Sequence, residues 1–160
     1  MPIRTRPATP ADLPVIVEYN SLLAFESEGK TLDRAVLTAG VAAALADPAK
    51  GFYTVAEDEA GSVVGQLLVT MEWSDWRNGF YWWIQSVYVA VASRRQGVFR
   101  KLYRDLEAEA TTRPDVIGIR LYVEHDNHAA RRTYAGLGLA DEPYGMMGRY
   151  PLPGRANAIS

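Results

Sequence analysis

Apolar positions recur along the chain with two different spacings, and these predict both helices and strands. After Thr9-Pro10, which suits the start of a helix, Leu13, Ile16 and Val17 follow at helical spacing. From residue 52 onward, β-branched and aromatic residues gather in short runs that are typical of strands. We therefore expect the element order βααβββαβαβ. The expected strands cover residues 3–6, 52–57, 63–73, 80–89, 117–123 and 143–150, and the expected helices run from 10 to 23, from 31 or 33 to 46, from 99 to 111 and from 127 to 137.

The connections between these elements predict an α/β fold with a mixed central sheet flanked by helices. Asn78-Gly79 is a hairpin signal because both residues tolerate positive φ, so the strands on either side of it should be antiparallel. The strand–helix–strand unit over residues 81–123 should place its two strands parallel, with a right-handed crossover. The 160 residues suit one domain, which we assign to residues 1–150, and we expect residues 151–160 to form a loose tail.

Composition and charge exclude several classes of function. The net charge is −2 and the isoelectric point is about 5.7, so no strongly basic surface is available to bind a nucleic acid. The absence of cysteine excludes disulfides, a cysteine nucleophile and a cysteine-ligated metal. His125 and His128 lack a clear third ligand, so we expect no metal site. With no signal peptide and no apolar run long enough to span a bilayer, we expect a soluble cytoplasmic protein without a membrane partner.

A loop between a predicted strand and a predicted helix has the features of a phosphate site. The strand ends near Val89, and the helix begins near Gly97, where its first amides have no intrahelical partner. Such a helix terminus binds phosphate, and glycine lets a ligand approach the backbone closely. Arg94, Arg95 and Arg100 add positive charge. The alternative is that Gly97 only relieves a turn and that the arginines are solvated.

A second segment, which follows the next predicted strand, places polar groups on a helix face. Ala130, Tyr134 and Leu137 lie three, seven and ten residues after Asn127, so they share one face of the predicted helix. One interpretation is that this face is core and that Asn127 is an N-cap. The other is that Asn127 and the Tyr134 hydroxyl bind a ligand, since packing alone does not favour such polar groups.

Together the two segments resemble the GNAT superfamily of N-acetyltransferases. The family motif Arg/Gln-x-x-Gly-x-Gly/Ala is matched at Arg94 and Gly97, and the motif Asn-x-x-Ala-x-x-x-Tyr, followed by Gly-Phe, is matched at residues 127–134 and 138–139. Phe99 departs from the pattern, because the family usually has glycine or alanine there. The resemblance covers nearly the whole chain and implies the GNAT acyl-CoA N-acyltransferase fold.

The resemblance also implies an activity and a set of site residues. The expected reaction is direct attack by a primary amine of a small molecule or peptide on acetyl-CoA, a co-substrate, in a ternary complex. Asn127 is expected to bind the pantetheine arm beside Ala130, and Tyr134 is expected to protonate the departing thiolate, as a phenol with a pKa near 10 can do. The other residues expected to hold acetyl-CoA are Val87, Tyr88, Val89, Arg94, Arg95, Gln96, Gly97, Val98, Phe99 and Arg100.

Several carboxylates are candidates for the general base that deprotonates the amine. Glu124 and Glu72 lie near the ends of predicted strands and are the preferred pair, while Glu26 and Glu28 follow the first helix. The alternative for each is a solvated side chain. The family often deprotonates the amine through a glutamate and an ordered water.

Aromatic residues around the predicted hairpin suggest where the acceptor binds. Trp73 and Trp76 flank Ser74-Asp75 close to the turn, where packing partners should be few. An aromatic wall there would suit an amine with an apolar or cationic body.

Two other classes of function remain open: a GNAT-fold module that binds acyl-CoA or a partner without catalysis, and an anion-binding module that uses the arginines. We expect no nucleic-acid partner, and a homodimer is compatible with the family.

Overall fold

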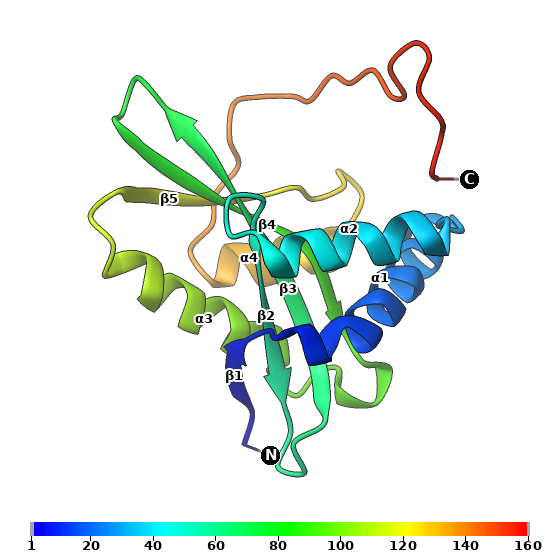
Figure 1. Cartoon of the computed structure of the whole chain (residues 1–160). Coiled ribbons are helices and arrows are strands. Elements are labelled where there is room, and N and C mark those ends of the chain that lie inside the picture. Colours follow the sequence, from blue (N-terminus) through cyan, green and yellow to red (C-terminus); the bar gives the residue numbers. More distant parts are fainter. Residues whose placement is uncertain (1, 160) are drawn as a thin grey trace.

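Five strands form one mixed sheet at the centre of the protein (Figure 1). The computed structural model describes residues 2–159. The strands lie in the order β1-β2-β3-β4-β5, and all neighbours are antiparallel except β4 and β5, which are parallel. The predicted mixed sheet with a parallel last pair is therefore confirmed. The strands are β1 (Arg4–Pro7), β2 (Phe52–Glu57), β3 (Val63–Ser74), β4 (Gly79–Val89) and β5 (Val116–Leu121).

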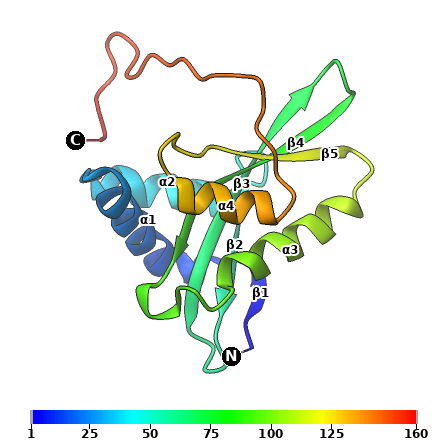
Figure 2. The ribbon, with the colours of Figure 1, turned by 180° about the vertical axis from the view of Figure 1, so that it is seen from behind.

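Helices cover both faces of this sheet (Figures 1 and 2). On one face, Ile16 of α1 and Val41 of α2 pack around Val55. On the other face, Leu102 and Leu106 of α3 pack in a second core, because they lie one turn apart on the same side of their helix. No helix within residues 2–159 combines the length and the apolar character needed to cross a membrane. The helices are α1 (Leu13–Glu28), α2 (Arg34–Ala46), α3 (Val98–Thr111) and α4 (His128–Gly136), with short 3₁₀ turns η1 (Pro10–Asp12) and η2 (Val91–Ser93).

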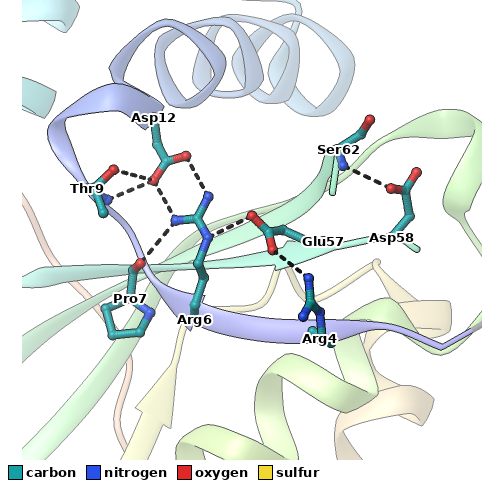
Figure 3. A network of polar contacts seen from close by, with 8 residues as sticks. All are labelled: Arg4, Arg6, Pro7, Thr9, Asp12, Glu57, Asp58 and Ser62. Atoms are coloured by element: carbon teal, nitrogen blue, oxygen red, sulfur yellow. Dashed lines mark hydrogen bonds and ion pairs between the residues drawn. The ribbon is translucent and has the colours of Figure 1, made fainter. Parts of the chain in front are cut away.

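An ion-pair network fixes how the chain passes from β1 into α1 (Figure 3). The Arg6 guanidinium donates to Glu57 Oε1 on β2 at 2.7 Å and to both carboxylate oxygens of Asp12, at 2.8 and 3.0 Å. Asp12 also accepts from the Thr9 backbone N–H at 2.7 Å. The hydrogen bonds from Arg6 lower the pKa of Asp12 below its usual range. The network therefore sets the direction of α1, the helix that borders the cleft described below.

A bulge in β4 opens the sheet between β4 and β5. Tyr88 pairs with Gln66, but Gln85 pairs with Leu68, so β4 contains one extra residue in this interval. Ser86 in the bulge has a φ of 51°, which is uncommon for a residue with a side chain. In the described chain, β5 pairs with β4 only as far as Ile84, so the last residues of β4 have a free edge on that side.

The predicted final strand over residues 143–150 is not formed, so this part of the expected βααβββαβαβ order is wrong. Residues 140–150 show no regular structure, and most of their side chains are exposed. A strand needs a hydrogen-bonded neighbour, and within residues 2–159 no strand lies beside this segment. The end of the chain instead approaches the α1–α2 connection, where the Asp33 N–H donates to Ala158 O at 3.1 Å.

Candidate active site

The loop between β4 and α3 presents backbone amides at an open surface. Gly97 is the N-cap of α3 with a φ of 81°, and a Cβ built there would meet nothing within 4 Å. The first intrahelical bond runs from Lys101 N to Gly97 O at 2.9 Å. The preceding amides of Val98, Phe99 and Arg100 therefore have no partner in their own helix. The predicted phosphate loop thus has the local geometry of an anion site.

The Arg94 side chain is bound by the protein itself. Its Nη2 donates to Glu26 Oε2 at 2.6 Å, and its Nε donates to Val89 O at 2.9 Å. The Tyr88 hydroxyl donates to the other Glu26 oxygen at 3.0 Å, and the guanidinium lies over the Tyr88 ring. The hydrogen bond from Arg94 lowers the pKa of Glu26. Glu26 therefore joins the last part of α1 to the loop, a link across 68 positions that no local pattern reveals.

Phe99, the departure from the family motif, turns its ring toward α4. Its ring centroid lies 5.5 Å from that of Tyr134, with the two rings edge to face. Burial raises the pKa of Tyr134 above its usual value, so its hydroxyl keeps its proton at neutral pH. Asn127 caps α4, since its Oδ1 accepts from the Ala130 N–H at 3.1 Å. The Phe99 ring thus packs against the ring of Tyr134.

Two adjoining cavities form one cleft between α1, the end of β5 and α4. The first encloses about 370 Å³ and the second about 320 Å³. Tyr134 and Asn127 line the second cavity, and Asn20 and Ser86 line the first. Because the cavities share a wall, a molecule in the first can reach the groups of the second. The shared wall consists of Ser27, Tyr122, Val123 and Glu124.

Of the two carboxylates preferred in the sequence, only Glu124 lines the cleft. Glu124 lines both cavities, and Glu28 lines the first. Glu72 lines neither; its carboxylate binds Arg120 at 2.8 Å, and Arg120 lies over the Tyr81 ring, 3.6 Å from its centroid. The structure therefore does not bring Glu72 and Glu124 into one cavity. No lysine or arginine lines either described cavity, so the cleft is acidic.

The two predicted acceptor-binding tryptophans lie on the β3–β4 hairpin, which projects beyond the helices (Figures 1 and 2). Trp76 is 85% exposed, and Trp73 packs edge to face on Phe80. Neither lines a described cavity. Besides Tyr134, the aromatic residue that lines the cleft is Tyr122, whose ring stacks on Trp83 with the ring centroids 4.5 Å apart. The sequence carried a signal for this residue, because Tyr122 lies two positions before Glu124 and therefore on the same side of an extended segment.

Behind the cleft lies a buried polar group that the sequence analysis missed. Gln66 is fully buried, and its Nε2 donates to Ser86 O at 3.1 Å and to Asn20 Oδ1 at 3.4 Å. Asn20 Nδ2 in turn donates to the Tyr53 hydroxyl at 3.4 Å. Gln66 thereby ties the β4 bulge to β3 and α1. An isolated polar residue in an apolar strand pattern was the available signal.

Comparisons with known proteins agree with this geometry. A family model described as the acetyltransferase (GNAT) family matches residues 17–139. The structure of a possible acetyltransferase from Clostridium difficile 630 is 44% identical in sequence, with a TM-score of 0.86 over 92% of this chain and 96% of that chain. No curated protein sequence matches the chain.

More distant solved structures show the fold alone. Glucosamine-6-phosphate N-acetyltransferase from Arabidopsis thaliana is 16% identical, with a TM-score of 0.72 over 94% of this chain and 99% of that chain. An aminoglycoside acetyltransferase from an uncultured soil metagenomic sample is 17% identical, with a TM-score of 0.71 over 93% of this chain and 99% of that chain.

Proposed function

The chain belongs to the GNAT family of acetyltransferases, and from this premise we propose that it transfers an acetyl group from acetyl-CoA to a primary amine of a small molecule or peptide. The amine attacks the thioester directly while both substrates are bound. One observation carries the proposal: a single cleft connects a protonated tyrosine, Tyr134, with a carboxylate, Glu124, beside the free edge of β4. These are the acid and base that such a transfer needs.

The residues of the β4–α3 region fit acetyl-CoA. Gly97 leaves open space in front of the first α3 amides, which would bind the pyrophosphate together with the Arg95 and Gln96 backbone. The free edge of β4 at Val87 and Val89 would pair with the amides of the pantetheine arm, as an added strand does. A backbone N–H near Val89 would polarise the thioester carbonyl. The bound acetyl-CoA supplies the activated acyl group.

Tyr134 would donate its proton to the CoA sulfur as the carbon–sulfur bond breaks. Its raised pKa keeps the phenol protonated until the thiolate forms. The edge-on Phe99 ring limits how far the Tyr134 ring, which lines the second cavity, can turn. Asn127 would hold the pantetheine arm beside it, with its Nδ2 as donor, because its Oδ1 caps α4.

Glu124 is the base that the structure favours for the amine. It lines both cavities, whereas the Glu72 carboxylate is held by Arg120. An ammonium ion is attracted to this acidic cleft and loses a proton to Glu124, directly or through a water, before it attacks. Tyr122 offers its ring to the apolar or cationic body of the acceptor.

Two measurements test the proposal. In a thermal-shift titration, acetyl-CoA at about 100 times its Kd should stabilise the protein by about 2.7 kcal/mol, or roughly 5–10 °C. A panel of amines should then be screened for CoA release. Absence of any thermal shift at millimolar acetyl-CoA would overturn the proposal, and binding without CoA release for any amine would favour a binding module without catalysis.

A further inference from the structure

The loop between β4 and α3 has an uncommon backbone shape. Arg95 has a φ of 63° and Gly97 has a φ of 81°, and the first value is unusual for a residue with a side chain. Such a backbone persists only where the surrounding structure holds it in place. Both residues stand just before the first amides of α3, so the direction of those amides depends on the contacts that hold the loop.

The Arg94 side chain makes two attachments immediately before this part of the loop. Its Nε donates to Val89 O at 2.9 Å, which closes the loop back onto the end of β4. Its Nη2 donates to Glu26 Oε2 at 2.6 Å, and Glu26 belongs to α1. The contact with Glu26 therefore fixes the loop against a different element of the fold.

Glu26 is a well-held anchor for this contact. Its other carboxylate oxygen accepts from the hydroxyl of Tyr88, a buried residue of β4, at 3.0 Å. The Tyr88 ring also packs on Tyr19 of α1, with the ring centroids 4.9 Å apart, and Tyr19 lies two turns before Glu26 on the same side of the helix. Exposed ion pairs usually contribute little, because two flexible side chains must be ordered. Here Tyr88 already orders one of the two.

The same contacts limit what Arg94 can do as a ligand of phosphate. Its charge is paired with that of Glu26, and two of its three guanidinium nitrogens donate to the protein. The Arg94–Glu26 pair therefore presents no net charge to an approaching anion.

We propose that Glu26 is a positioning residue for acetyl-CoA, which acts through Arg94 to hold the β4–α3 loop in the shape that presents the α3 amides to the pyrophosphate. This inference rests on the proposed function. A loop that already has its binding shape loses less conformational freedom when the ligand binds, so the affinity is higher. In this role neither side chain has to touch the ligand.

The sign of one substitution separates this role from direct binding of phosphate by Arg94. If Arg94 bound the phosphate, Glu26→Gln would release the arginine and remove a negative charge near an anionic ligand, and both changes favour acetyl-CoA. In the positioning role, Glu26→Gln loosens the loop instead. The Kd for acetyl-CoA should then rise, by roughly three- to tenfold, although a negative charge has been removed.

The experiment is isothermal titration calorimetry of acetyl-CoA with the native protein, Glu26→Gln, Arg94→Met and the double variant. The double variant should bind no more weakly than Arg94→Met alone, because Glu26 acts through Arg94. The matched control is Glu18→Gln on the same helix, whose carboxylate pairs with Arg34 of α2 at 3.2 Å; its Kd should be that of the native protein.

Hydrogen exchange of the free proteins adds a measurement that needs no ligand. Amides of residues 90–97 should exchange faster in Glu26→Gln than in the native protein or in Glu18→Gln. An unchanged or lower Kd for Glu26→Gln would refute the inference and leave the proposed function standing, as would unchanged exchange in the loop or additive losses in the double variant. Failure of the native protein itself to bind acetyl-CoA would refute both.

Discussion

Replacing Gly97 by valine separates the phosphate-binding role of the β4–α3 loop from its role in folding. The φ of 81° disfavours any side chain, and the strain should cost about 1–2 kcal/mol, or roughly 2–8 °C in Tm. Apart from residue 97 and its two chain neighbours, no described atom lies within 4 Å of the new Cβ, so backbone strain is the main expected cost to the free protein. The open space is nevertheless where the pyrophosphate would approach the α3 amides.

The expected effect of Gly97→Val on acetyl-CoA is larger than its effect on folding. Loss of one or two hydrogen bonds to a charged phosphate costs about 1.5–3 kcal/mol each, so the Kd should rise by at least tenfold. The matched control is Gly61→Val in the β2–β3 turn, where φ is 79° and a Cβ also meets nothing within 4 Å. Both variants should lose similar stability, and only Gly97→Val should lose affinity.

The assay is isothermal titration calorimetry with acetyl-CoA, paired with thermal melts of the free proteins. If Gly97→Val binds acetyl-CoA as tightly as Gly61→Val does, the loop does not hold the pyrophosphate, and the assignment of the α3 amides is refuted.

Three further changes test other parts of the structure. Tyr134→Phe should keep acetyl-CoA affinity but lower kcat by about ten- to ten-thousand-fold, the range for a lost general acid; an unchanged kcat with lower stability would show a packing role. Tyr122→Ala should raise the KM for the acceptor amine and leave the KM for acetyl-CoA unchanged, as measured by steady-state kinetics. Trp76 lies outside the cleft, so Trp76→Ala should raise the acceptor KM less. A larger rise in acceptor KM for Trp76→Ala than for Tyr122→Ala would contradict this assignment. The lowered pKa of Asp12 contributes stability above the pKa of the unfolded chain, near 4, and that stability is lost as the pH falls through the folded value. Arg6→Met should therefore lose about 2 kcal/mol at pH 7 in urea unfolding, and the difference from the unsubstituted protein should shrink in acid; a difference independent of pH would disprove the role of the ion pair.

Much of the fold follows from local patterns. The helices, the hairpin and the parallel crossover were predicted from spacing and turn residues, and the resemblance to the GNAT family is confirmed. The bulge at Ser86 was not predictable, because it reverses the alternation of faces within β4. Trp82 packs in the α3 core, whereas Tyr88, six residues later, points toward Glu26 of α1. A pattern with a period of two assigns both rings to the same face.

The candidate site was only partly predictable for a related reason. Motif residues such as Tyr134 and Asn127 do line the cleft, because their spacing on one helix is a local property. The choice between Glu72 and Glu124 as the candidate base depends on Arg120 of β5, because its guanidinium binds the Glu72 carboxylate on β3. The prediction of a final strand over residues 143–150 was wrong because strand formation depends on a hydrogen-bonded neighbour, and the pattern of one segment does not encode that neighbour.

The order of the strands has a consequence for synthesis. In the order β1 to β4, each strand pairs with the next strand of the chain, and only the connection through α1 and α2 is long. β5 pairs with β4 only after α3 has been synthesised. A nascent chain that emerges N-terminus first can thus form the antiparallel sheet while the cleft still lacks Tyr122, Glu124 and Tyr134. The sheet of β1 to β4 can therefore fold on the ribosome before the candidate site is assembled, and β4 keeps an open edge beside Trp82 until residues 116–121 dock.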